Sequence, residues 1–359
     1  MISPALLDIV RCPDCAGALR ASAPDDVRCV SCGRPFDAAS GVLDLRPREA
    51  FAEQTKYLDA ALHEDARHES ILPPLLGSKI RLDVLRRFLR PAAGDRILDL
   101  GCGSGRTMAW VAGTGASMTG IDIAPYFARE AIDRFDLLLA DLRRLPLRDG
   151  AFTKAWSLDV LEHLTRPALS GVLEEANRVL TKGGALFVYT HVRRNGWPAI
   201  GVRAANAVAR ACERVGLLDL SHQRLRKSDH VNPLADHDDL ARVVGRSGFR
   251  IERLTYYTPV TGAFIENVLV RIGERVLAGR RRRDAAAPDR DATRRRAAAT
   301  SRVRRRGVTY VVLLALSGLM TIDLWLFGRI RSGPFFALLR KVGPPAALQP
   351  EAGTAEART

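Results

Sequence analysis

From Gly94 onward, short runs of apolar residues alternate with stretches whose apolar positions repeat at helical spacing. Apolar runs of about four to eight residues between turn residues are typical of buried strands, and longer periodic stretches are typical of helices. The pattern therefore predicts an α/β fold built on a doubly wound parallel sheet. The predicted strands are Arg96–Leu100, Ser117–Asp122, Asp136–Ala140, Phe152–Leu158, Ala185–His191, Phe249–Tyr257 and Pro334–Leu339.

Changes in this pattern divide the chain into segments. A long polar interruption at 192–235, with a predicted helix near 199–215, is typical of a lid or substrate loop. The predicted units are 1–48 (a cysteine-paired module), 49–93 (a helical segment), 94–260 (the core, with the insertion 192–235), 261–330 (a basic and apolar helical insertion), 331–342 (the last core strand) and 343–359 (a disordered tail).

Composition excludes a wholly disordered or fibrous chain, because 47% of the 359 residues are hydrophobic and 26% are charged. The formal net charge of +15 is concentrated in one place. The run Arg280–Arg306 holds twelve Arg and three Asp, a net charge of +9. The excess charge is therefore a property of this run and not of the whole surface.

Four of the six cysteines form two Cys-x-x-Cys pairs, Cys12 with Cys15 and Cys29 with Cys32, separated by thirteen residues. This spacing predicts a structural zinc site, since four thiolates leave no open position for water. The alternative is four buried cysteines without metal. Residues 1–10 lack the basic and apolar regions of a signal peptide, so we expect a reducing, cytoplasmic compartment.

A glycine-rich turn follows the first core strand. Gly101, Gly103 and Gly105 come directly after Asp99-Leu100, at a place where the backbone can approach a ligand closely. Asp122 ends the next strand, twenty-one residues after Gly101, and a carboxylate there can accept both hydroxyls of a ribose. An acid-rich edge repels a pyrophosphate and tolerates a sulfonium ligand. Helix capping or solvated strand ends are the alternative interpretation of these acids.

The motifs Leu98-Asp-Leu-Gly-Cys-Gly-Ser-Gly105, Gly120-Ile-Asp-Ile-Ala-Pro125, Ala140-Asp-Leu142 and Ser157-Leu-Asp-Val-Leu-Glu-His-Leu164 resemble class I S-adenosylmethionine-dependent methyltransferases of the type 11 group, over about Gly94–Tyr257. The resemblance implies a Rossmann-like sheet of seven strands. It also implies cofactor contacts. The implied residues are Asp99, Gly101, Gly103 and Gly105 for the methionine end, Asp122 for the ribose, Asp141 and Leu142 for the adenine, and Ile123 as a further cofactor contact.

Residues 6–45 resemble the zinc ribbon that activates methyltransferases as a separate protein, and also the ribbon fused to some ribosomal RNA guanine methyltransferases. Under this resemblance Cys12, Cys15, Cys29 and Cys32 are the zinc ligands.

A methyl acceptor that loses a proton needs a base near it. We predict that His163, His191 and His230 are the catalytic candidates, with Tyr189, His222 and Asp229 as further polar groups at the same edge of the sheet. A structural hydrogen-bonding role for His163 and an ordinary exposed loop around His230 are the alternatives.

The segment Gly307–Ile322 is sixteen residues without a charge, and Asp323 follows before Leu324–Phe327. That is short for a spanning helix of about twenty residues, and a single crossing would separate the strand near Pro334 from the sheet. We therefore expect a helix lying in the membrane plane, with the Arg run attracted to anionic lipid. A buried core helix is the alternative, and the Arg run as an RNA-binding arm is another.

The sequence thus predicts an S-adenosylmethionine-dependent methyltransferase that acts on a small, apolar or lipid-linked acceptor, as a cytoplasmic protein peripheral to the inner face of the cell membrane. An RNA methyltransferase that uses the ribbon and the Arg run is one alternative. A non-catalytic, cofactor-binding adaptor is another.

Overall fold

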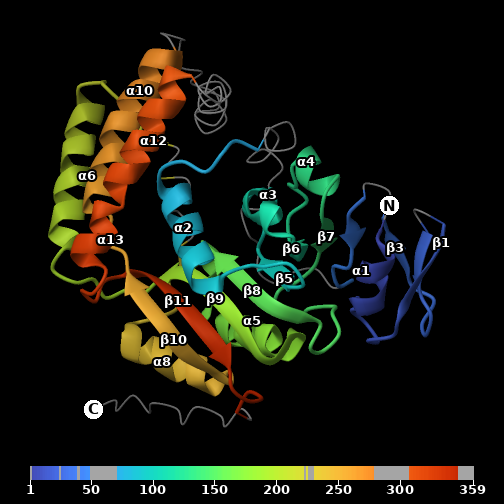
Figure 1. The fold of residues 1–359 in the computed structure, drawn as a ribbon. Helices are drawn as coiled ribbons and strands as arrows, with labels where there is room; N and C mark the ends of the chain where they lie inside the picture. Colours follow the sequence, from blue (N-terminus) through green and yellow to red (C-terminus); the bar gives the residue numbers. More distant parts are fainter. Residues whose placement is uncertain are drawn as a thin grey trace, which may run out of the picture.

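The computed structural model describes residues 2–23, 26–38, 41–48, 71–221, 224, 230–278 and 307–346. The predicted Arg run, residues 49–70 of the helical segment 49–93, residues 347–359 of the tail, and the side chains of His222 and Asp229 lie outside these residues. Figure 1 shows a long central sheet, a small blue module at one end of it and a group of long helices at the other.

The central sheet has eight strands in the order β10-β11-β9-β8-β5-β6-β7-β4. All its neighbouring pairs are parallel except those that β11 makes with β9 and β10, which are antiparallel. The strands are β4 (Leu43–Asp44), β5 (Arg96–Leu100), β6 (Ser117–Asp122), β7 (Asp136–Leu139), β8 (Phe152–Leu158), β9 (Leu180–His191), β10 (Phe249–Tyr256) and β11 (Pro334–Lys341). The seven predicted strands are confirmed, and β4 is an eighth, edge strand that the sequence pattern did not predict.

Helices cover both faces of this sheet because alternate strand residues bury apolar side chains on opposite sides. Leu98 and Leu100 of β5 face one core, whereas Ile97 faces the other. The first core includes α5 (Arg166–Val179) and α8 (His237–Arg246). The second includes α2 (Gly77–Leu89), α3 (Arg106–Val111) and α4 (Arg129–Ile132). Short 3-10 turns, η4 (Ala112–Thr114) and η5 (Leu161–His163), complete the connections.

The N-terminal module is a ribbon of three antiparallel strands preceded by a helix. It consists of α1 (Pro4–Ile9), β1 (Leu19–Ala23), β2 (Asp26–Cys29) and β3 (Pro35–Asp37). Its apolar side chains, such as Leu6 and Val10, belong to the same core as Leu138 of β7. Because β4 then pairs with β7, the ribbon is an extension of the sheet edge and shares its interior.

Three long helical stretches form a group beside α2, which we call the helical annex (Figure 1). It contains α6 (Ala199–Arg214), the continuous run of α9 (Val260–Phe264), η6 (Ile265–Leu269, a π-helical turn) and α10 (Val270–Ala278), and the pair α12 (Val308–Met320) and α13 (Ile322–Phe327). The Asn267 side-chain amide donates to Asn206 Oδ1 at 2.8 Å, and Ser317 Oγ accepts the N–H of Leu76 at 2.6 Å. These contacts fix the annex to itself and to α2.

The apolar stretch is not the buried core helix that was one of the alternatives. Val308–Phe327 is long and apolar enough to cross a membrane, yet only 17% of its most apolar window is buried. Asp323 is the exception, since it is fully buried and its carboxylate accepts the N–H groups of Thr261 and Gly262 at 2.9 and 2.8 Å. Asp323 therefore caps α9 and attaches α13 to the neighbouring helical stretch of the annex through one polar side chain.

Candidate active site

The glycine turn after β5 has a backbone that side chains would disrupt. Gly101 and Gly103 have φ angles of 77° and 52°, in the left-handed region. A Cβ atom on Gly101 would lie 2.4 Å from Val160 Cγ2, so the turn packs directly on the segment that follows β8. A Cβ atom on Gly103 would meet no protein atom within 4 Å. The backbone at Gly103 is thus bordered by space that a ligand can fill.

Asp122, at the end of β6, fixes this turn. Its Oδ2 accepts the N–H of Gly103 at 2.8 Å and its Oδ1 accepts the N–H of Ala124 at 3.0 Å. Burial raises the pKa of Asp122, and these N–H groups oppose the rise. Each carboxylate oxygen keeps a free lone pair. The site therefore fits a pair of ribose hydroxyls, the contact predicted for Asp122.

Asp99, on β5, is the most unusual acid of the site. Its side chain is 3% exposed, and Oδ2 is buried without a hydrogen-bond partner. Burial, followed by the charge of the neighbouring Asp122, raises the pKa of Asp99 to about 7. Such a buried, incompletely solvated acid is suited to meet a positive charge, as the methionine end of S-adenosylmethionine carries.

Cofactor binding should therefore depend on pH near neutrality. A positive ligand stabilises the ionised form of Asp99, so binding releases a proton wherever the acid is protonated in the free protein. We expect the apparent affinity for S-adenosylmethionine to fall by about tenfold per pH unit below pH 7, where Asp99 must lose a proton on binding. Calorimetry at several pH values, in buffers of different ionisation heat, measures both effects. The variant Asp99→Asn should bind more weakly and lose the pH dependence, and a wild-type affinity independent of pH would contradict this assignment.

The same raised pKa has an opposite consequence for stability. The folded state holds the Asp99 proton more tightly than the unfolded chain, whose pKa is near 3.8. Stability is thus highest below about pH 4 for this group and falls as pH rises to about 7. Ionisation of the buried Asp99 lowers the stability of the protein at neutral pH, as is typical of an acid whose role is to bind a ligand.

Asp141, after β7, has a nearer partner than the sequence suggested. The Arg143 guanidinium forms a bidentate pair with it, with Nε 3.0 Å from both oxygens and Nη2 2.8 Å from Oδ2. Leu142 and Ile123 are both partly buried. The adenine contact predicted for Asp141 and Leu142 stays a prediction, and in it Arg143 would share the carboxylate.

The three predicted histidines come together at the carboxyl ends of β8 and β9. The rings of His163 and His230 have their centroids 4.7 Å apart at 87°, and the ring of His191 lies 6.0 Å from that of His230. At their centre is Glu162, whose side chain is 1% exposed. Sequence reasoning treated Glu162 only as the neighbour of His163. The signal that could have identified Glu162 was its place in the motif that follows β8, in the turn η5 beside His163.

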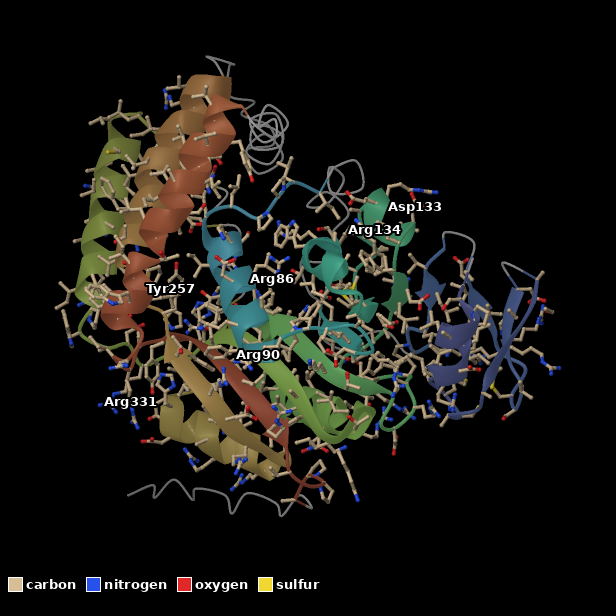
Figure 2. All side chains as sticks on the ribbon, viewed as in Figure 1. Arg86, Arg90, Asp133, Arg134, Tyr257 and Arg331 are labelled. Atoms are coloured by element: carbon tan, nitrogen blue, oxygen red, sulfur yellow. The ribbon has the colours of Figure 1, made fainter. Side chains whose placement is uncertain are left out.

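A second polar cluster, which sequence reasoning missed, lies between β9 and the annex. Arg81 of α2 is 3.3 Å from Asp159 (Nε to Oδ2), and its guanidinium lies 5.4 Å from the centroid of the Tyr189 ring. Asp159 has a φ of 57°, a strained conformation at the end of β8. The hydroxyl of Tyr257 is buried without a hydrogen-bond partner, at the point where α2, β10 and the annex meet (Figure 2). No sequence motif marked Arg81.

The four ribbon cysteines are free and close together. Cys12 Sγ lies 3.7 Å from Cys32 Sγ, and Cys15 Sγ lies 3.4 Å from Cys29 Sγ. A tetrahedral zinc site with bonds of about 2.3 Å separates its sulfurs by about 3.8 Å, so the group fits zinc. Burial raises the pKa of Cys29, but the N–H groups of Cys32 and Ser31 outweigh burial and lower it to about 7. The ribbon therefore offers a readily ionised thiol to the metal.

Comparison with known proteins agrees with this geometry. The family described as methyltransferase domain matches residues 98–188. A sterol 4-C-methyltransferase of Caenorhabditis elegans is 29% identical over 164 residues, which are 42% of this chain and 48% of the relative. The methyltransferase GfsG of Streptomyces halstedii is 30% identical over 43% of this chain and 62% of its own.

A demethylmenaquinone methyltransferase of Tropheryma whipplei is 30% identical over 171 residues, which are 46% of this chain and 70% of the relative. The chain spans about half to two thirds of the length of the first relatives it matches. The matched region contains the glycine turn, Asp99, Asp122 and Asp141. The chain belongs to the class I S-adenosylmethionine-dependent methyltransferases.

Proposed function

We propose that the protein methylates a small, apolar or lipid-linked acceptor at the cytoplasmic face of a membrane. The observation that carries this proposal is the apolar surface of the helical annex, which stands beside the carboxyl edge of the sheet. Relatives named for a sterol, for demethylmenaquinone and for ubiquinone biosynthesis support the same acceptor class.

The annex exposes large apolar side chains to an extent that is unusual for a surface in contact with water. Trp325 is 83% exposed, Val308 82% and Val276 74%. Among the described residues, the large apolar side chains exposed outside the annex and its flanking turns are Val30, Val231 and Val342. Large apolar side chains exposed on neighbouring helices are typical of a membrane or protein contact.

The topology favours a shallow position in the membrane over a crossing. After α13 the chain returns to the sheet, where β11 lies between β9 and β10. A single crossing by residues 308–327 would place β11 on the far side of the bilayer. Trp197 and Trp325 flank the annex surface, and exposed Trp is frequent where a membrane meets water. The Arg-rich sequence at 280–306 adds attraction to anionic lipid.

The chain's own residues divide the reaction between them. The glycine turn, Asp99 and Asp122 hold S-adenosylmethionine, which supplies the methyl group as a sulfonium and leaves as a neutral thioether. The electron pair of the broken bond stays on sulfur, so the acceptor that forms the new bond to the methyl carbon must lose a proton. We assign removal of that proton to the histidine cluster, and to His191 first, because its Nδ1 lies 3.5 Å from Glu162 Oε1. The annex and α2 exclude water from the acceptor side.

Radiolabelled S-adenosylmethionine identifies the acceptor. The purified protein is offered total lipid extract and total RNA in parallel, and we expect label in the lipid. Label in RNA would favour the alternative in which the ribbon and the Arg run bind RNA, with an affinity that falls steeply with salt. Cofactor binding without label in either fraction would favour the adaptor.

Membrane attachment has its own test. We expect the double variant Val311→Glu, Trp325→Glu to bind anionic vesicles with an affinity at least about tenfold lower than that of the wild type, because two exposed apolar contacts are lost. The matched control is Val342→Glu, which changes an exposed valine that directly follows β11 and is outside the annex. Vesicle flotation measures the bound fraction. Equal binding of the double variant and the wild type would overturn the role of the annex.

A further inference from the structure

Glu162 is a buried acid with little to balance its charge. Its Oε2 accepts the hydroxyl of Thr190 at 2.9 Å, and its Oε1 lies 3.5 Å from His191 Nδ1, longer than a good hydrogen bond. Within the described part of the chain, His191 is its ion-pair partner, and neither Lys nor Arg takes that place. Burying an ionised carboxylate is costly unless a cation or a metal balances it.

Two imidazoles approach this carboxylate from separate parts of the chain. Ligand atoms of Glu162, His163 and His230 all lie within 4.8 Å of one another. His163 belongs to η5, whereas His230 stands near the end of the insertion 192–235.

The backbone holds His230 in this place. The N–H groups of Val231 and Asn232 both donate to the carbonyl of Glu162, at 2.9 and 2.8 Å. Asn232 adopts a left-handed φ of 48°, which costs energy outside glycine, and its side-chain Oδ1 is buried without a donor. The segment that carries His230 is thus tied to the backbone of Glu162 and also contains a buried side-chain oxygen without a hydrogen-bond donor.

We propose that Glu162, His163 and His230 bind a divalent first-row transition cation. Two imidazoles and one carboxylate suit such ions, and this set leaves coordination positions open for other oxygen ligands. Ligand atoms around a cation are about 3 to 3.5 Å apart for bonds of about 2.1 Å, so the observed separations, all within 4.8 Å, need only small side-chain adjustments to reach this geometry. The cation supplies the positively charged partner that balances the buried carboxylate of Glu162.

The position of this site gives it a role. Gly101 packs on Val160, two residues before Glu162, so the cluster lies beside the turn that borders the cofactor space. A cation there would hold an oxygen atom of the acceptor and favour loss of its proton to His191. This role rests on the proposed methyl transfer, whereas binding of the cation does not.

Mn²⁺ is the probe, because thiolate ligands such as those of the ribbon bind it weakly. Its binding therefore reports on the site of Glu162, His163 and His230 and not on the ribbon. With the ribbon filled with zinc, we expect the electron paramagnetic resonance of free Mn²⁺ to decrease by one equivalent per chain, and excess Zn²⁺ to displace the bound ion. Glu162→Gln keeps an oxygen for Thr190 and should weaken Mn²⁺ binding about tenfold or more, as should His230→Ala.

The control is His237→Gln. His237 bonds to the carbonyl of Ser332 and makes none of the cluster contacts, so this variant should bind Mn²⁺ like the wild type. Thermal unfolding and cofactor affinity establish that each variant is folded. Absence of Mn²⁺ binding by the wild type, with zinc content remaining at one per chain after excess Zn²⁺, would overturn the proposal. Because no acceptor is present, failure of the proposed acceptor class leaves this result unchanged.

Discussion

We expect the four ribbon cysteines to bind zinc, and removal of that zinc should unfold the ribbon and detach strand β4 from the sheet. Structural zinc held by cysteines contributes about 10 kcal/mol or more to the folding of small modules. The ribbon has only three short strands and one short helix to replace that contribution. It also holds the segment after Asp141, because the N–H of Arg11 donates to Pro146 and the N–H of Arg148 donates to Ile9. Loss of the ribbon should therefore weaken cofactor binding several-fold as well.

Hydrogen exchange measures this effect directly. After chelation, or in the variant Cys29→Ser, amides of the ribbon strands and of β7 should exchange at least about a hundredfold faster, while those of β8 and β9 stay protected. Cys212→Ser, which changes a partly buried cysteine of α6, is the matched control and should exchange like the wild type. Ribbon amides that remain protected without metal would show that packing alone holds this module.

The variant Asp122→Ala should lose cofactor binding almost completely. The carboxylate is expected to accept two ribose hydroxyls, and hydrogen bonds to a charged group contribute about 1.5 to 3 kcal/mol each. Their loss corresponds to a decrease in affinity of about a hundredfold or more. The variant also leaves the N–H groups of Gly103 and Ala124 without their acceptor, so part of the effect comes from the turn itself.

A second substitution separates these two causes. Asp122→Asn keeps one oxygen acceptor for the turn and removes the charge, so it should bind the cofactor better than Asp122→Ala and worse than the wild type. Asp133→Ala is the control, since Asp133, labelled in Figure 2, is an exposed acid that pairs with Arg129 and, in the part of the chain that the structure describes, makes no contact with the glycine turn. Calorimetric titration with S-adenosylmethionine measures all four proteins. Unchanged affinity of Asp122→Ala would refute the site assignment.

The central sheet was predictable because each of its long strands carries its own apolar run. The strand at residues 117–122 was predicted with the same bounds as the structure gives. β4 was not predicted, because a strand of two residues is too short to show an alternation of apolar and polar positions. Its pairing with β7 also depends on the ribbon being packed against the sheet. β9 begins at Leu180 instead of Ala185, because Gly183 and Gly184 interrupt the apolar run within the strand.

The site was predictable only where its residues lie in one motif. The glycine turn and Asp122 are read from spacing, and the structure brings them within hydrogen-bond distance. The three histidines were found one by one, but their convergence on Glu162 brings together His191 and His230, which follow Glu162 by 29 and 68 residues in the chain. The pairing of Asp141 with Arg143 is a local contact that the motif did not include. The spacing of residues in the sequence does not show which basic side chain forms an ion pair with a given acid.

The place of β11 has a consequence for how the chain acquires its structure during synthesis. This strand lies between β9 and β10, but it begins 78 residues after the end of β10 and 143 residues after the end of β9, and the whole of α12 and α13 comes before it. Until the ribosome has released residue 341, both neighbours present unpaired edges, and such edges recruit other chains. The sheet also waits for a long loop to close, which slows folding. The apolar helices therefore leave the ribosome before the sheet is sealed, and a nascent chain that meets a membrane surface at this stage is protected from aggregation.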